Sequence, residues 1–413
     1  MKTKIEHLRE TAIAGAKTVR TCGVKKYVLE QELTFVEKYH REEYFLIAHQ
    51  LIMELKKSKD ILLGPGWDWM IGSHVCCSLG LTNISPRDAD ANPILTWGNE
   101  ECNPTISIEV DEESLHLVFS KAIELFGYEN VARMPVKIDK ESHQALVVCL
   151  DGIANHFAVE EATDKILCVK ESVAGCDNQK VFRFDVIPSV VLSRIKRVQE
   201  QIAKNGKKYP KLYETWIWNE DYQLFYDGDL SDIPMFGCTS IQELTQMLLP
   251  KRQYGNFGEL LNVLGIFHAR EGFALNEEAI AEYQHKHGVF NILGKNVFPW
   301  GFLYREEVAW FLNGWIGLSW KQAAQVMAFA DAKEERVAER LKHIYLHQGM
   351  DNGFKEAELN QIWDSLFKRK SKKPLPSKAH YAGRLYLSVF LARLKREFPE
   401  EFNTAHQHEK KKE

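Results

Sequence analysis

Between residues 61 and 190 the sequence is divided into short apolar runs typical of β-strands, and helical periodicity surrounds this block on both sides. The runs are Ile61–Leu63, Thr105–Val110, Ala145–Leu150, Ile166–Val169 and Val181–Ile187. Helical patterns precede the block at residues 4–20 and 26–57, interrupt it near 71–80 and 113–126, and dominate from residue 189 onward. A stretch of strands followed by a stretch of helices predicts an α+β fold.

The length and composition of the chain limit the number of domains and the kinds of partner. The 413 residues are long enough for two or three domains, and 45% hydrophobic content is ordinary for a globular protein. We expect domains over residues 1–200 and 201–404, and a disordered tail over 405–413. The net charge of −4 gives no general attraction to nucleic acid, so such binding would need local patches.

The eight cysteines form no C-x-x-C pair, which argues against a zinc site. The sequence shows no signal peptide and no long apolar run. It therefore predicts a cytoplasmic protein with reduced thiols and no membrane partner.

One predicted strand carries a possible site. Because side chains alternate along a strand, Thr105, Ser107, Glu109 and Asp111 share one face. On the run Val181–Ile187, Arg183 and Asp185 share a face in the same way. Carboxylates on neighbouring strands hold two metal ions in many nucleotidyl-transfer enzymes, but a solvated acidic strand edge would give the same pattern.

The loop Gly64–Ser73, which reads GPGWDWMIGS, follows the first β-type run. A glycine-rich loop that opens a helix can bind phosphate through its backbone N–H groups. Here, however, two tryptophans and an aspartate fill the loop. Trp67 and Trp69 either pack into the vacated pocket, as we expect, or stack on unpaired bases.

These residues together resemble the palm and fingers of bacterial DNA polymerase III alpha subunits, the C-family replicases. The similar segments follow one order along the chain: Tyr44–Ile47, Gly64–Gly66, Gly72–Ser73, Leu79–Pro86, Pro104–Val110, Phe126–Ala132, Phe182–Asp185, Leu303–Val308, Pro376–Ala382 and Leu394–Phe402. The resemblance implies a palm of nucleotidyltransferase type with a mixed β-sheet, followed by an all-α fingers domain.

The departures from the family concern its active site. Thr105 and Ser107 stand where the family has two metal-binding aspartates, whereas Asp185 is retained and Arg183 replaces a lysine. Glu109 fills a third carboxylate position of the family. The family's glycine-arginine-glycine-serine loop is here Gly66-Trp67-Asp68-Trp69. The remnants of the nucleotide loop are Gly64, Gly66, Gly72, Ser73 and Arg183.

The fingers show similar losses. The family's basic segment is replaced by Met327–Lys333, and its arginine-proline-glycine turn is reduced to Arg270 and Gly272. Near residues 132–137 the chain passes directly between palm segments, where the family inserts a thumb. We therefore expect a truncated protein.

The densest positive region lies late in the chain and is a candidate DNA-binding surface. Its members are Lys368, Arg369, Lys370, Lys372, Lys373, Lys378, His380 and Arg384. Basic runs are often only solvated, but they can also bind the phosphate backbone of nucleic acid. A second, weaker cluster comprises Lys204, Lys207, Lys208 and Lys211.

The function expected from the resemblance is that of a DNA polymerase III alpha-like protein of replication or repair that is catalytically inactive. Its partner would be DNA or a replication protein, and it would need no cofactor. The first alternative is an active nucleotidyltransferase that uses Asp185, Glu109 and Asp111 with Mg²⁺, of which Asp185 and Glu109 would hold the metal. The second alternative is a protein-interaction scaffold without affinity for nucleic acid.

Overall fold

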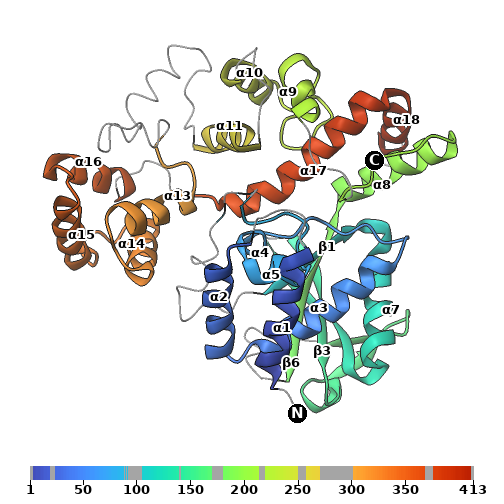
Figure 1. Ribbon diagram of the computed structural model, residues 1–413. Coiled ribbons are helices and arrows are strands. Elements are labelled where there is room, and N and C mark those ends of the chain that lie inside the picture. The colour runs from blue at the N-terminus through green and yellow to red at the C-terminus, as the bar shows by residue number, and fades with distance from the viewer. Residues whose placement is uncertain are drawn as a thin grey trace. The chain divides into compact units, whose positions relative to one another are not determined.

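The computed structural model describes residues 3–18, 24–87, 89, 91, 105–138, 141–169, 180–213, 219–249, 257–269, 301–367 and 375–410 (Figure 1). Its packing divides the chain into two compact units. The first unit comprises Met1–Asp88, Asn103–Asp221 and Tyr386–Glu413, and the second comprises Ala89–Cys102 and Tyr222–Leu385. Among the residues that the structure describes, no helix is both long enough and apolar enough to cross a membrane.

The described part of the first unit contains a six-stranded mixed sheet with the strand order β1-β6-β3-β2-β5-β4. The strands are β1 Ile106–Asp111, β2 Val131–Ile138, β3 Glu141–Cys149, β4 Val159–Glu161, β5 Leu167–Val169 and β6 Val181–Ser189. The pairs β1–β6 and β2–β5 are parallel, and the other neighbours are antiparallel. The predicted α+β fold with a mixed sheet is confirmed.

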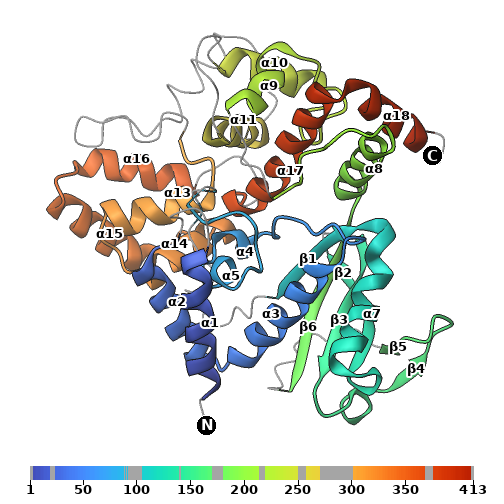
Figure 2. The same cartoon turned by 45° about the vertical axis from the view of Figure 1, so that its right-hand side comes forward.

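The described part of the first unit also contains helices. They are α1 Lys4–Thr18, α2 Lys26–Lys38, α3 Glu42–Lys57, α4 Trp69–Gly72, α5 His74–Ser78, α7 Leu115–Phe126, α8 Val190–Lys204 and α18 Pro399–Lys410. Of these helices, α7 packs against β2 and α8 packs against β1. Figure 2 shows α3 and α7 lying along one face of the sheet. Helix α7 ends where Gly127 takes a φ of 93°, as its sequence predicts.

The helical periodicity of residues 26–57 belongs to two helices rather than one. Helices α2 and α3 are separated at His40, whose φ of 51° cannot continue a right-handed helix. Helix α3 then buries one apolar stripe, which includes Phe45, Leu51 and Leu55. Burial of each such side chain contributes about 1.5–3 kcal/mol.

Tyr44 connects α3 to the sheet. Its ring stacks on Phe184 at a centroid distance of 5.1 Å, and its hydroxyl donates to the Arg183 carbonyl at 2.7 Å. The same hydroxyl accepts a hydrogen bond from the Ile106 N–H at 2.7 Å. One buried oxygen therefore joins β1 to β6 where their pairing begins, and burial raises its pKa.

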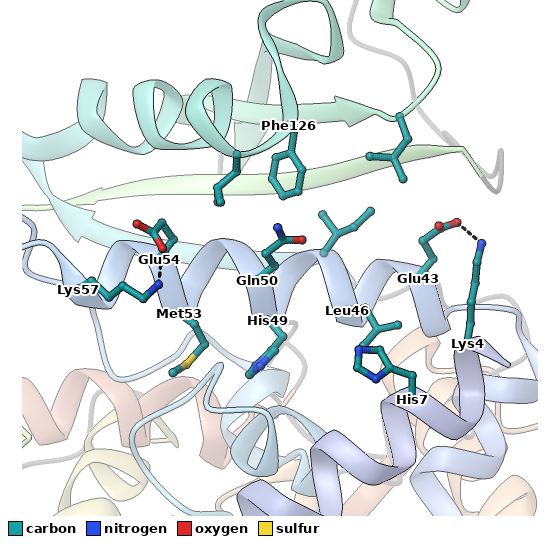
Figure 3. Close-up of a pocket in the computed structure, with 13 residues that line it drawn as sticks. Lys4, His7, Glu43, Leu46, His49, Gln50, Met53, Glu54, Lys57 and Phe126 are labelled. Atoms are coloured by element: carbon teal, nitrogen blue, oxygen red, sulfur yellow. Dashed lines mark hydrogen bonds and ion pairs between the residues drawn. The ribbon is translucent and has the colours of Figure 1, made fainter. Parts of the chain in front are cut away.

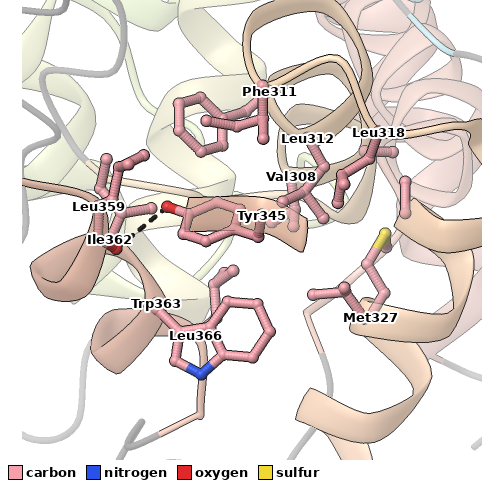
Figure 4. Close-up of a cluster of buried hydrophobic side chains, with 14 of the residues drawn as sticks. Val308, Phe311, Leu312, Leu318, Met327, Tyr345, Leu359, Ile362, Trp363 and Leu366 are labelled. Carbon is pink, nitrogen blue, oxygen red and sulfur yellow. Dashed lines mark hydrogen bonds between the residues drawn. The ribbon is translucent and has the colours of Figure 1, made fainter. Parts of the chain in front are cut away.

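The second unit is helical over its described residues. Its helices are α9 Gln223–Asp227, α10 Thr239–Leu248, α11 Phe257–Ala269, α13 Arg305–Trp310, α14 Trp320–Ala332, α15 Glu339–Asp351, α16 Glu356–Phe367 and the first part of α17 Lys378–Glu397, with a π-helical turn over Phe311–Trp315. Figure 4 shows the core that four of these helices share with the π-helical turn. Its centre is Tyr345, whose hydroxyl donates to the Leu359 carbonyl at 3.1 Å. The sequence pattern also predicts a helix over residues 276–285, which lie outside the described residues.

The C-terminal segment returns to the first unit, which differs from the predicted domain division. The unit boundary falls inside α17 between Leu385 and Tyr386, and another lies at Asp221 rather than near residue 200. Tyr386 stacks on Tyr213 and donates its hydroxyl to the Leu212 carbonyl at 2.7 Å. Such long-range contacts leave no mark in local periodicity.

Helix α18 packs against α8, as both ribbon views show. Buried Glu401 accepts hydrogen bonds from Lys207 at 2.7 Å and from Asn205 at 2.8 Å, which tie the two helices together. Because α18 extends to Lys410, the structure differs from the predicted disordered tail over residues 405–410.

We predict that Tyr44→Phe lowers the free energy of unfolding by about 2–4 kcal/mol, because it leaves the Ile106 N–H and the Arg183 carbonyl buried without a partner. The ring stacking survives in this variant, so the loss reports the hydroxyl alone. Urea unfolding measures it, with Tyr27→Phe as control because the Tyr27 side chain is 65% exposed. Equal stability of the two variants would contradict the role of Tyr44.

We also predict a pH-dependent loss of stability in Glu401→Gln. Hydrogen bonds from Lys207 and then Asn205 lower the pKa of Glu401 from 4.5 to about 2. A carboxylate with a lowered pKa stabilises the fold above its unfolded pKa and loses that effect as the pH falls. The difference in Tm between wild type and variant should therefore be full at neutral pH and shrink as the pH falls from about 5 towards 3. A pH-independent difference would show that the charge of Glu401 contributes nothing.

Candidate functional site

The two strands that carry the predicted site lie side by side. Strands β1 and β6 pair in parallel, and the register places Ser107 opposite Asp185. Register partners in a sheet point to the same face, so these side chains are neighbours. A hydroxyl, rather than a second carboxylate, therefore lies next to Asp185 on this face of the sheet.

Asp185 is held by an arginine of its own strand. The Arg183 Nη2 lies 2.7 Å from the Asp185 Oδ1, and its Nε donates to the same oxygen at 2.9 Å. The Asp185 side chain is only 11% exposed. In this charge-assisted contact the guanidinium of Arg183 compensates the charge of the carboxylate.

Glu109 lies two residues beyond Ser107, about 6.6 Å further along the strand. It is buried and packs under Gly64, where an added Cβ would lie 2.1 Å from the Glu109 Oε2. The Gly64 N–H donates to the Glu109 carbonyl at 2.8 Å. Gly64 is therefore required by this close approach, and the Glu109 side chain faces protein rather than an open site.

Asp111, at the end of β1, is fully buried and its oxygens are occupied. The Lys196 Nζ lies 2.9 Å from its Oδ1, and the Ser114 hydroxyl donates to that oxygen at 2.9 Å. The Leu62 N–H donates to the Oδ2 at 2.9 Å. Asp111 is also about 13 Å along the strand from Ser107. It connects β1 to α8 and to the loop before Gly64.

The tryptophan-rich loop packs against the start of β1. The Trp69 Nε1 donates to the Thr105 carbonyl at 3.0 Å, and the Ser107 N–H donates to the Met70 sulfur at 3.3 Å. Both Trp67 and Trp69 are partly buried. For Trp69 this contact supports the expected packing role.

The same loop contains a strained residue. Asp68 takes φ 46° and ψ −127°, in a region that favours glycine. It stands at the position where the resembled family has the second glycine of its loop. Gly66 is conformationally required as well, because its φ is 122° and an added Cβ would lie 2.6 Å from a Thr82 methyl carbon.

Ser73 faces an acid of the protein itself. Its hydroxyl donates to the Glu32 Oε2 at 2.6 Å, and the His74 N–H donates to the Oε1 at 2.7 Å. Glu32 is 1% exposed and thus serves as the internal partner of the first turn of α5. Gly72, just before it, is buried.

No group of three or more His, Cys, Asp or Glu side chains that could hold a metal ion occurs among the described residues. This finding agrees with the geometry of the three acids. Asp185 is paired with Arg183, Glu109 lies under Gly64, and Asp111 is bound to Lys196.

The predicted DNA-binding residues Lys368–Lys373 lie outside the described residues, and so do Arg270 and Gly272 of the reduced turn. Lys378 is 7% exposed, lies 3.7 Å from Glu307 and stacks over the Tyr304 ring at 5.7 Å, so its ammonium faces the interior. Its neighbour His380 is partly exposed, and Arg384 is exposed.

Two motifs that are far apart in sequence meet in the second unit. Glu306 accepts hydrogen bonds from the Ser377 hydroxyl at 2.8 Å and from the Lys378 and Ala379 N–H groups at 2.7 and 3.2 Å. This carboxylate therefore caps the first turn of α17, where the helix dipole favours a negative charge. Burial raises the pKa of Glu306, and the N–H donors oppose that shift.

The sequence patterns did not indicate Glu32 and Lys196. Glu32 accepts the hydrogen bond of the Ser73 hydroxyl, and Lys196 pairs with the carboxylate of Asp111. Lys196 is 85 residues from its carboxylate partner, and Glu32 is 41 residues from Ser73. Nothing in the local pattern of α2 or α8 marks them, because each lies on an ordinary amphipathic helix.

A groove of about 810 Å³ lies between α1, α3 and the end of α7 (Figure 3). Ion pairs Lys4–Glu43 and Lys57–Glu54 lie along it. Since α3 stacks Tyr44 on Phe184, and successive strand residues face opposite ways, α3 covers the face opposite Asp185. The groove is therefore separate from the predicted carboxylate site.

Comparison with known proteins shows a similarity in the N-terminal part of the chain. The family described as the bacterial DNA polymerase III alpha NTPase domain matches residues 6–162, which include β1 but end before β6. DNA polymerase III subunit alpha of Mycoplasma pneumoniae is 28% identical over 140 residues, which cover 33% of this chain and 15% of that protein. The Aquifex aeolicus subunit is 30% identical over 145 residues, which cover 32% of this chain and 12% of the relative. The matched segments thus span less than a sixth of these relatives, and the N-terminal part of this chain is similar to the bacterial DNA polymerase III alpha subunits.

Proposed function

We propose that this DNA polymerase III alpha-like protein acts in replication or repair by binding DNA, without catalysing nucleotide addition. The single observation that carries the proposal is the register of β1 against β6, which puts Ser107 opposite Asp185. Two-metal catalysis needs carboxylates that bridge ions about 3.5–4 Å apart. A serine hydroxyl supplies no negative charge for a divalent cation, and Mg²⁺ loses its waters only to strong anionic ligands.

The other acids do not replace the missing pair. Glu109 and Asp111 are displaced along β1 by about 6.6 and 13 Å from the Ser107 position. Asp111 is further neutralised by Lys196. These positions weigh against the alternative of an active enzyme that uses both acids with Asp185 and Mg²⁺, so the proposed role requires no metal cofactor.

The proposal places the protein in the cytoplasm, where DNA is replicated in bacteria. The described cysteines, which are Cys76, Cys77, Cys149, Cys168 and Cys238, form no disulfide bond with one another. Free thiols are typical of reducing compartments. A replication protein is the alternative partner, and a scaffold without nucleic acid affinity is the remaining one.

Primer extension tests the inactive site directly. We expect purified protein with Mg²⁺ or Mn²⁺ to incorporate no more nucleotide than the matched variant Asp185→Ala. Incorporation that depends on Asp185 would overturn the catalytic part of the proposal. Binding of DNA at about 50 mM and about 200 mM salt tests the other part, because phosphate contacts weaken as salt rises. Absence of binding at the lower salt would favour the scaffold.

Restoring the acids should create a metal site. We predict that Thr105→Asp with Ser107→Asp lowers stability by about 1–3 kcal/mol in EDTA, because it adds carboxylates beside the buried Asp185. Mn²⁺ should then raise the Tm of this double variant by several degrees. Thermal unfolding with and without Mn²⁺ measures both effects, with Thr105→Asn and Ser107→Asn as the neutral control.

The response of the wild-type protein to Mn²⁺ is the reference for that experiment. We expect Mn²⁺ to leave the Tm of wild type and of the asparagine control unchanged. An equal Mn²⁺ stabilisation of the wild type would mean that Asp185 and Glu109 already hold an ion, which contradicts the proposal.

A further inference from the structure

The nine residues after the core of α8, Ala203–Lys211, read AKNGKKYPK and contain four lysines and no acid. We call this segment the lysine loop. Residues 203–209 and Lys211 are exposed. A run of this composition is often only solvated, and it forms a binding surface when the fold holds its backbone in place and leaves its side chains accessible.

The backbone of the lysine loop is fixed at several points. The Lys207 N–H donates to the Ile202 carbonyl at 3.1 Å, and the Gly206 N–H donates to the Ala203 carbonyl at 2.9 Å. With a φ of 69° at Gly206, this is a Schellman motif that ends α8. The Gln199 side chain also donates to the Pro210 carbonyl at 3.0 Å. A loop that is ordered before binding loses less entropy when it meets a ligand.

The lysines of the loop differ in whether they form an ion pair within the protein. Lys207 is 2.7 Å from buried Glu401 and anchors the loop to α18. Lys204 and Lys208, in contrast, make no hydrogen bond or ion pair with any residue in the described ranges. Two ammonium groups are thus presented to solvent from a rigid backbone, without an acid of the described chain to neutralise them.

An exposed aromatic ring lies between these groups and the end of the loop. Tyr209 is 38% exposed and directly follows Lys208. Sites for single-stranded nucleic acid combine cations along the backbone with aromatic rings on which unpaired bases stack. A duplex offers no such free base face.

We propose that the lysine loop binds single-stranded nucleic acid, with Lys204 and Lys208 at phosphates and Tyr209 stacked on a base. The inference rests on the proposed DNA-binding function and names the surface that performs it. Phosphate contacts of this kind carry no sequence preference and depend strongly on salt.

The test is fluorescence anisotropy of a labelled oligo(dT) with the full chain at several salt concentrations. For Lys204→Gln with Lys208→Gln, we expect the slope of log affinity against log salt to fall by about 1.4, at about 0.7 per lost contact. The control Lys59→Gln with Lys165→Gln removes the same charge from two exposed lysines of the same unit and should keep the wild-type slope. Tyr209→Ala should bind about tenfold more weakly and Tyr209→Phe as wild type.

The outcomes separate this inference from the proposed function. If wild type binds with salt dependence and the Lys204/Lys208 variant keeps its slope, the lysine loop assignment is overturned while DNA binding stands. If wild type binds no oligonucleotide, the proposed function fails as well. Binding to phosphatidylserine vesicles in place of oligo(dT), lost in the same variant, would overturn the nucleic acid assignment in favour of a lipid surface.

Discussion

The parallel pairing of β1 with β6 is the constraint on which the first unit depends. Tyr44 secures it where the two strands begin, since its hydroxyl accepts from β1 and donates to β6. The pairing fixes which side chain of β1 meets Asp185, and that side chain belongs to Ser107. A parallel pair needs a long connection, so this contact links segments that are far apart in the sequence.

The carboxylates on β1 and β6 have partners within the protein. Asp185 is satisfied by Arg183, and Asp111 by Lys196 together with Ser114. A buried carboxylate must be paired or hydrogen-bonded, and here each acid obtains its partner from the chain. The similarity to DNA polymerase III alpha subunits is therefore combined with acids that have basic partners within the chain.

Much of the fold could be predicted from periodicity, and the exceptions have physical causes. Strand β2 was missed because Arg133, Pro135 and Lys137 interrupt its apolar pattern, although Pro135 pairs with Gln144 in the ladder. Strand β4 was missed because three residues are too short for alternation to be visible. The run Ile61–Leu63 forms only a bridge from Leu63 to Val110, because the chain turns away at Gly64.

The sequence alone determined the α+β class and the absence of acids at positions 105 and 107. It also determined that Ser107, Glu109 and Asp111 share one face of a strand. These features follow from residue identity and from the alternation of side chains, which are local properties. Only the tertiary structure decided that Ser107 is the neighbour of Asp185 and that Lys196 neutralises Asp111 from 85 residues away. It also showed Lys378 to be buried. These outcomes depend on strand register and helix packing, which join distant segments through contacts that no local pattern encodes.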